Sequence, residues 1–141
     1  ALGCTVGEIL DNDEAMNCIA EIGMEYAKVI LAEGVEPEEL FGLLPIPENV
    51  CFDNLEQREK VKAYWKRVYS PYRGQIASML QDLRNGKTCE IDNINGEMIR
   101  IADMNGVKVP YNKKIVKTIL ELQRKEIDID KAWENLQAFK G

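Results

Sequence analysis

The residues best suited to chemistry in this 141-residue chain lie between Ser78 and Pro110, around a short break between two predicted helices. Ser78 offers a hydroxyl that can donate a hydrogen bond to an anionic group, and Glu90 offers a carboxylate that can accept one. The chain contains no histidine. Acid or base catalysis within it must therefore use Glu, Asp, Lys, Tyr or Cys.

The spacing around Glu90 has two interpretations. A helix is predicted to start near this residue, and the free N–H groups of a helix start stabilise an anion. Spacing alone favours ordinary capping of the first helical turn. A role in catalysis is the alternative.

Ser78 and Asp82 are four residues apart and share one face of a predicted helix, and Gln75 precedes them on the same side. A polar stripe of this kind is typical of a solvent-facing surface. The opposite apolar stripe is intact, so the polar side is equally suited to lining a cleft. Asp82 and Asp92 are interpreted mainly as packing and capping groups.

Two basic residues, Arg84 and Lys87, fall at the break between the helices. Their position favours a role at the negative end of the helix dipole, and a contact with a cofactor phosphate is the sharper alternative. Asn95-Gly96 lies inside the next predicted helix, where glycine is unfavourable relative to alanine. Close helix packing or close approach of another backbone is the expected reason.

The composition is that of a globular domain, with 45% hydrophobic and 30% charged residues and enough length for one core. The net charge of −6 argues against a nucleic-acid partner. No apolar run is long enough to cross a bilayer, and no secretory signal is visible, so we expect no membrane partner and a cytoplasmic location. No pair of cysteines shows metal-site spacing, which predicts reduced thiols and no metal at Cys4, Cys18, Cys51 and Cys89.

The first half of the chain shows helical periodicity in two stretches. One runs from about Asp13 to Glu33, with Asn12 or Asp11 as its cap and Gly34 after its end. The other runs from Asn54, which forms a predicted capping box with Gln57, to about residue 68. Between them we expect an irregular connector, with one short helical turn at 38–43.

The second half also has helical spacing throughout. Four helices are predicted: from Pro71 to Gly86, from 88–90 to Gly106, from Pro110 onward, and a short one capped by Asp130. The alternation at 126–130 is too short to build a sheet. We therefore expect a single all-α domain over residues 1–141, an irregular bundle of about six helices.

The segment from Ser78 to Pro110 resembles the signature of the C-terminal domain of the ketopantoate reductase (2-dehydropantoate 2-reductase) family. That family has a Ser-Met-x-x-Asp helix, then Thr-Glu-Ile-Asp, Asn-Gly, and a later Gly followed by Pro and Asn. Cys89 is a departure, since the family usually has Thr directly before Glu. The resemblance covers essentially the whole chain and is dense over 78–112, where the matching residues are Ser78, Met79, Asp82, Glu90, Ile91, Asp92, Asn95, Gly96, Gly106, Pro110 and Asn112.

This resemblance implies a fold like the C-terminal domain of 6-phosphogluconate dehydrogenase, acting as a substrate-binding and dimerisation domain. By resemblance, Glu90 is catalytic and hydrogen-bonds the substrate hydroxyl, Ser78 binds the substrate carboxylate, and Gln75 lies near the nicotinamide. NADPH would be held mainly by an N-terminal Rossmann domain. The catalytic lysine of the family would likewise lie just before the start of this chain. No G-x-G-x-x-G pattern occurs here, so we expect that domain to be absent from this chain and these residues alone to be inactive.

The implied reaction is the reduction of 2-dehydropantoate to pantoate, in the pathway to pantothenate and coenzyme A. Two alternatives remain open at this point. One is a non-catalytic helical module for interaction or homodimer formation. The other is a reductase of a different 2-keto acid, because fold does not determine side-chain specificity.

Overall fold

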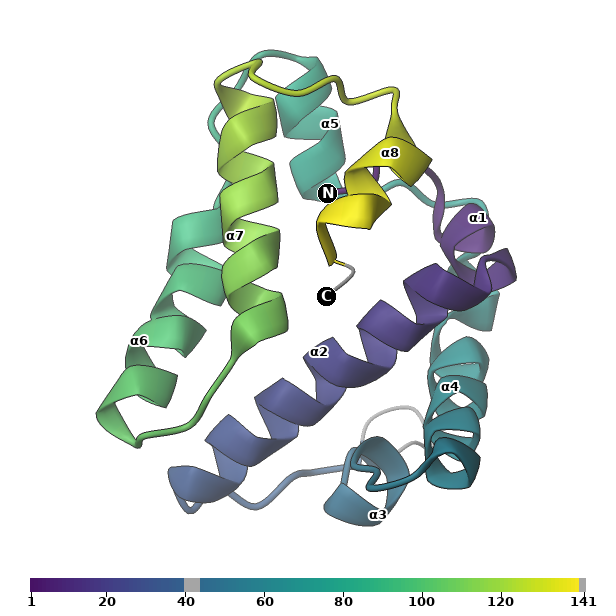
Figure 1. Ribbon diagram of the computed structural model, residues 1–141, viewed down its shortest axis with the longest axis vertical. Helices are drawn as coiled ribbons and strands as arrows, with labels where there is room; N and C mark the ends of the chain where they lie inside the picture. Colours follow the sequence, from purple (N-terminus) through teal and green to yellow (C-terminus); the bar gives the residue numbers. More distant parts are fainter. Residues whose placement is uncertain (40–43, 140–141) are drawn as a thin grey trace.

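The computed structural model describes residues 1–39 and 44–139, and every regular element within these ranges is helical. This confirms the expected all-α class. Figure 1 shows the arrangement around the long central helix α2. The α-helices are α1 (Val6–Asp11), α2 (Asp13–Ala32), α3 (Pro47–Val50), α4 (Leu55–Tyr69), α5 (Ser78–Arg84), α6 (Glu97–Met104), α7 (Pro110–Gln123) and α8 (Ala132–Leu136). A π-helical turn, Asp92–Gly96, precedes α6, and short 3-10 turns follow α4 (Ser70–Tyr72) and α8 (Gln137–Phe139).

Helix α2 organises the domain because it contacts five other helices, namely α1, α3, α4, α6 and α7. Its start is capped by Asn12, whose Oδ1 accepts a hydrogen bond from the N–H of Ala15 at 2.9 Å. The chain turns away at Gly34, which adopts a left-handed φ of 70°. Both ends agree with the sequence prediction.

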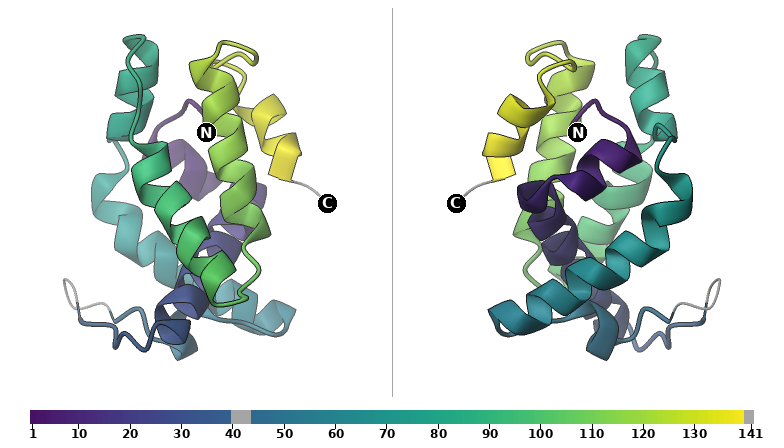
Figure 2. Two further views of the ribbon diagram at one scale, coloured as in Figure 1. Left: turned by 90° about the vertical axis from the view of Figure 1, so that its left-hand side faces the viewer. Right: turned by 90° about the vertical axis from the view of Figure 1, so that its right-hand side faces the viewer.

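The helices lie on two sides of α2. Helices α6 and α7 run beside each other on one side, and α4 crosses on the other (Figures 1 and 2). The buried residues form several local clusters rather than one layer. The cluster between α2 and α6 consists of Val29, Met98, Ala102 and Val109, and the cluster under α5 and α7 consists of Cys89, Ile91 and Ile119.

Two short helices of the first half differ from the prediction. Helix α1 was not expected, although Thr5 and Glu8 form a complete capping box at its start. The short turn proposed at 38–43 falls partly on residues 40–43, outside the described residues, and no helix is present at 35–39. The short helix that is present, α3, begins instead at Pro47, a residue well suited to a first helical position.

The boundaries of the later helices also needed correction. Helix α5 begins at Ser78 rather than at Pro71, since Pro71 belongs to the 3-10 turn. Asp130 does not cap α8; its carboxylate lies 3.6 Å from Arg84, and Lys131 occupies the cap position without a side-chain hydrogen bond. The side chain of Gln57 accepts a hydrogen bond from the N–H of Asp53 rather than from the N–H of Asn54. Only the bond from the Gln57 N–H to the Asn54 side chain is present, so the predicted capping box at α4 is half formed.

Candidate functional site

Ser78 is the first residue of α5, and its side chain is on the exposed surface. The helix is short and ends in a left-handed Gly86 with a φ of 68°. The turn is closed by a 2.8 Å hydrogen bond from the N–H of Lys87 to the carbonyl of Asp82. This tight end sends the chain back alongside α5 toward Glu90.

Glu90 is an exposed residue held between two buried ones, Cys89 and Ile91. The N–H of Cys89 donates to Oε1 of Gln123 on α7 at 3.1 Å. On the other side, the carbonyl of Glu90 accepts the first hydrogen bonds of the next helix, from Asn93 and Ile94. The backbone of Glu90 is therefore fixed at both neighbours while its carboxylate faces outward.

The segments that carry Ser78 and Glu90 share one part of the core. Met79, next to Ser78, packs with Leu83 against the buried cluster of Cys89, Ile91 and Ile119. Within the described ranges, the Ser78 hydroxyl and the Glu90 carboxylate make no hydrogen bond to each other or to another side chain. Both groups are thus free to bind a ligand while their backbones are anchored together.

Gln75 lies in the irregular segment before α5, and α1 holds that segment in place. The N–H of Val6 donates to the carbonyl of Gln75 at 3.0 Å, and the N–H of Gly7 donates to the carbonyl of Arg73 at 2.8 Å. The approach is close, since a Cβ on Gly7 would lie 3.0 Å from that carbonyl oxygen. The exposed side chain of Gln75 therefore extends from a fixed backbone.

A buried polar network that includes Asn95, in the π-helical turn after Glu90, was not predicted from the sequence. Glu25 on α2 is only 4% exposed, and its carboxylate accepts hydrogen bonds from the N–H groups of Tyr111 and Asn112 at the start of α7. The Nδ2 group of Asn112 donates to the same carboxylate, and its Oδ1 accepts from Asn95 at 3.0 Å. The signal in the sequence was the start of α7 at Val109-Pro110, where the cap residue has no polar side chain. The free N–H groups of that helix start therefore need an acceptor from elsewhere in the fold.

Arg84 and Lys87, the two basic residues at the end of α5, differ in their surroundings. Arg84 donates to the carbonyl of Gly3 at 3.0 Å, and Lys87 is exposed.

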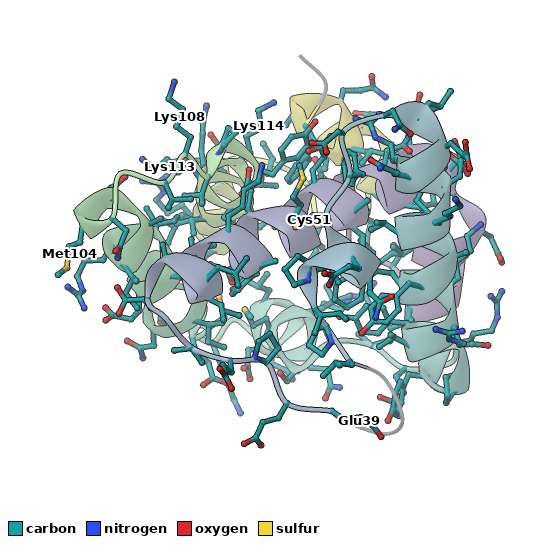
Figure 3. The ribbon with its side chains drawn as sticks, turned by 90° about the horizontal axis from the view of Figure 1, so that it is seen from below. Glu39, Cys51, Met104, Lys108, Lys113 and Lys114 are labelled. Carbon is teal, nitrogen blue, oxygen red and sulfur yellow. The ribbon has the colours of Figure 1, made fainter. Side chains whose placement is uncertain are left out.

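Three lysines, Lys108, Lys113 and Lys114, lie around the start of α7 (Figure 3). Lys113 pairs with Asp103, and Lys114 donates to the carbonyl of Phe139. The N-terminus of α7 is already occupied by the Glu25 carboxylate, so it does not offer a phosphate site.

The hollowed part of the surface between α2 and α4 is a separate feature. This apolar groove has a volume of about 370 Å³ and is lined by residues such as Gly23, Tyr26, Trp65 and Tyr69. None of the predicted site residues lines it. Over the described residues, no group of three or more Cys, Asp or Glu side chains is arranged to hold a metal ion. Within those ranges, no helix has the length and apolar character needed to cross a bilayer.

The all-α fold is consistent with the C-terminal domain of a ketopantoate reductase. The family model "Ketopantoate reductase PanE/ApbA C terminal" matches residues 1–123, and the chain belongs to this family. It is 31% identical over 106 residues to the 2-dehydropantoate 2-reductase of Pyrococcus horikoshii, covering 75% of this chain and 29% of that protein. It is 27% identical over 129 residues to the corresponding Salmonella typhi protein, covering 92% and 34% of the two chains.

The chain therefore spans about a third of the length of these curated relatives. A relative from Streptococcus pyogenes, also named 2-dehydropantoate 2-reductase, is 28% identical over 119 residues. No solved structure gives a significant match to the chain.

Proposed function

We propose that this domain binds the substrate of an NADPH-dependent reductase that converts 2-dehydropantoate (ketopantoate) to pantoate, a step toward pantothenate and coenzyme A. The observation that supports the proposal is the set of surroundings of the Glu90 side chain. Its carboxylate is exposed and has no hydrogen-bond or ion-pair partner among the described residues, while the flanking Cys89 and Ile91 are buried. A carboxylate that capped this helical turn would accept a hydrogen bond from a backbone N–H group, and within the described ranges the Glu90 carboxylate accepts none.

In the proposed site, Glu90 accepts a hydrogen bond from the hydroxyl of ketopantoate and so orients its 2-keto group. Ser78 donates to the substrate carboxylate. Each role suits the group concerned, since a carboxylate is a strong acceptor and a serine hydroxyl can donate to an anion. Holding both ends of the substrate fixes the keto carbon, and such orientation accounts for a large part of many catalytic rate enhancements.

Gln75 is the residue of this chain that we propose to contact the nicotinamide. The exposed Gln75 amide makes no hydrogen bond to any residue that the structure describes, and it offers both a donor and an acceptor, which is the complement of a carboxamide group. When bound, NADPH would supply the hydride, and a lysine outside these residues would supply the proton. The role proposed for this chain is to bind and orient the keto acid between them.

The activity can be tested in a polypeptide in which the nucleotide-binding domain precedes these residues, hereafter the two-domain protein. We expect it to oxidise NADPH with ketopantoate, and the 141 residues alone to fold without activity. Consumption of NADPH with a different 2-keto acid only would favour a reductase of that acid. No consumption with any 2-keto acid would favour a non-catalytic helical module.

A comparison substrate sharpens this test. Trimethylpyruvate has the carbon skeleton of ketopantoate without its hydroxyl group. If Glu90 binds that hydroxyl, trimethylpyruvate should be reduced on the order of 10²-fold less efficiently, because the polar partner is missing. Equal efficiency with the two acids would argue against the proposed role of Glu90.

A further inference from the structure

Three buried polar side chains connect α2 to the turn that follows Glu90. The Glu25 carboxylate accepts from Asn112 Nδ2 at 2.6 Å, and Asn112 Oδ1 accepts from Asn95 Nδ2 at 3.0 Å. All three residues are at most 8% exposed. They belong to α2, α7 and the π-helical turn, so the network joins segments that are far apart in the sequence.

The network has a defined direction because of the chemistry of its first member. An ionised carboxylate can only accept hydrogen bonds, so Asn112 must turn its Nδ2 group toward Glu25. Its Oδ1 is then left facing Asn95, which must donate. The carboxylate also accepts from two backbone N–H groups of α7, at 2.8 and 2.9 Å, and these bonds compensate its burial.

Asn95 lies in the π-helical turn Asp92–Gly96, which starts two residues after Glu90. The first hydrogen bonds of this turn, from Asn93 and Ile94, end on the carbonyl of Glu90. The orientation of the Glu90 peptide therefore depends on the same turn that Asn95 anchors. A π-helical turn is an uncommon conformation and persists where surrounding contacts support it.

We propose that Glu25 is a positioning residue for Glu90, acting through Asn112 and Asn95 on the turn that holds the Glu90 backbone; this inference rests on the proposed function of Glu90. The network fixes the direction in which the Glu90 carboxylate leaves the backbone. A small displacement of such a group is expected to lower turnover strongly.

The test uses Glu25→Gln in the two-domain protein. The variant keeps the size of the side chain, but its amide NH2 faces groups that are themselves donors, so at least one hydrogen bond is lost. We expect kcat for ketopantoate to fall about 10- to 100-fold. The matched control is Glu33→Gln, because Glu33 follows the last residue of α2 and accepts from Asn105 on the exposed surface, away from Glu90. This control should change kcat less than about 2-fold.

A second variant separates positioning from stability. Asn95→Ala removes the link to the turn and leaves the Glu25 carboxylate on the start of α7. It should reproduce the loss in kcat even if Glu25→Gln is poorly folded. Normal kcat in a folded Asn95→Ala protein would overturn the inference.

The decisive comparison places Glu25→Gln or Asn95→Ala in a Glu90→Ala background. If the network acts through Glu90, either substitution should then lower kcat by less than about 3-fold, because residues acting as a unit are not additive. An undiminished further loss would mean that Glu25 acts independently of Glu90, and the inference would be wrong.

Hydrogen exchange distinguishes failure of this inference from failure of the proposed function. Glu25→Gln and Asn95→Ala should speed amide exchange at Asn93 and Ile94, whether or not ketopantoate is the substrate. Unchanged exchange at both amides would overturn the positioning role. Faster exchange together with a fully active Glu90→Ala protein would overturn only the catalytic assignment of Glu90 and leave the physical link in place.

Discussion

Gly23 on α2 lies directly against the indole ring of Trp65 on α4. A Cβ atom built on Gly23 would come within 2.6 Å of Cζ2 of that ring, closer than carbon atoms can approach. The ring of Tyr69 stacks on the ring of Trp65, with 5.9 Å between the two ring centroids. The close crossing of α2 and α4 therefore depends on the absence of a side chain at position 23.

We expect Gly23→Ala to lower the free energy of unfolding by about 1–3 kcal/mol, because the Trp65 ring or one of the helices must shift. The higher helix propensity of alanine offsets only about 1 kcal/mol of this overpacking. Urea denaturation followed by tryptophan fluorescence measures the change. Gly74→Ala is the matched control, since no atom of the described residues lies within 4 Å of the added Cβ there. Equal stabilities for the two variants would contradict the packing described here.

Glu90→Ala in the two-domain protein should lower kcat/KM for ketopantoate on the order of 10²-fold or more, with little change in melting temperature. The reason is loss of a hydrogen bond that orients the substrate. The same variant should have little effect on the slow reduction of trimethylpyruvate, which has no hydroxyl for Glu90 to bind. Near-normal kcat/KM for ketopantoate would leave Glu90 as a residue of the helix start only.

Ser78→Ala should mainly raise KM, because a hydroxyl that binds the carboxylate in the ground state and the transition state contributes uniform binding. A hydrogen bond to a charged group is worth roughly 1.5–3 kcal/mol, which corresponds to a loss of about 10- to 100-fold in kcat/KM. Ser70→Ala, at another exposed serine, serves as the control. An intact fold with unchanged KM would remove Ser78 from the site.

Lys62 and Asp13 provide a prediction for stability against pH. The buried amine of Lys62 donates to the carboxylates of Asp13 and Glu59, and the hydrogen bond from Lys62 lowers the pKa of Asp13 from its ordinary 3.8. A lowered carboxyl pKa contributes stability above the unfolded value, and that contribution is lost as the pH falls through the folded value. The sign is therefore toward weaker folding below about pH 4.

Melting temperatures of the wild type and Lys62→Met between pH 7 and pH 2.5 test this prediction. The wild type should lose more of its melting temperature than the variant over this range, because the variant has no amine to favour the ionised Asp13. Lys113→Met is the control, since Lys113 and its partner Asp103 are both exposed and such pairs contribute little. Parallel pH curves for the wild type and Lys62→Met would show that the pair does not couple to folding.

Local chemistry in the sequence was sufficient for the main helices. Asn12 and Asn54 accept hydrogen bonds at the starts of α2 and α4, and Gly34 ends α2, each at the predicted position. These signals act over three or four residues, so they can be read without tertiary information. The Thr5–Glu8 capping box was equally local, and α1 was predictable from it in principle.

The start of α5 depended on contacts that the local pattern does not contain. The N–H groups of Val6 and Gly7 hold the carbonyls of Gln75 and Arg73, so the 3-10 turn that contains Pro71 is followed by a turn and an irregular stretch, and α5 begins only at Ser78. These partners are more than sixty residues apart in the sequence. The pattern of apolar residues gives no information about such pairing.

By itself, the sequence determined the all-helical class, the ends of the long helices and the family motif that includes Ser78 and Glu90, because helix capping, periodicity and motif spacing are local properties. The tertiary structure decided that Glu90 is exposed between buried neighbours and that Glu25 is buried against Asn112, 87 residues away. From the sequence alone, the carboxylate of Glu25 would be assigned to the surface. Only the fold brings it the N–H donors that make its burial favourable.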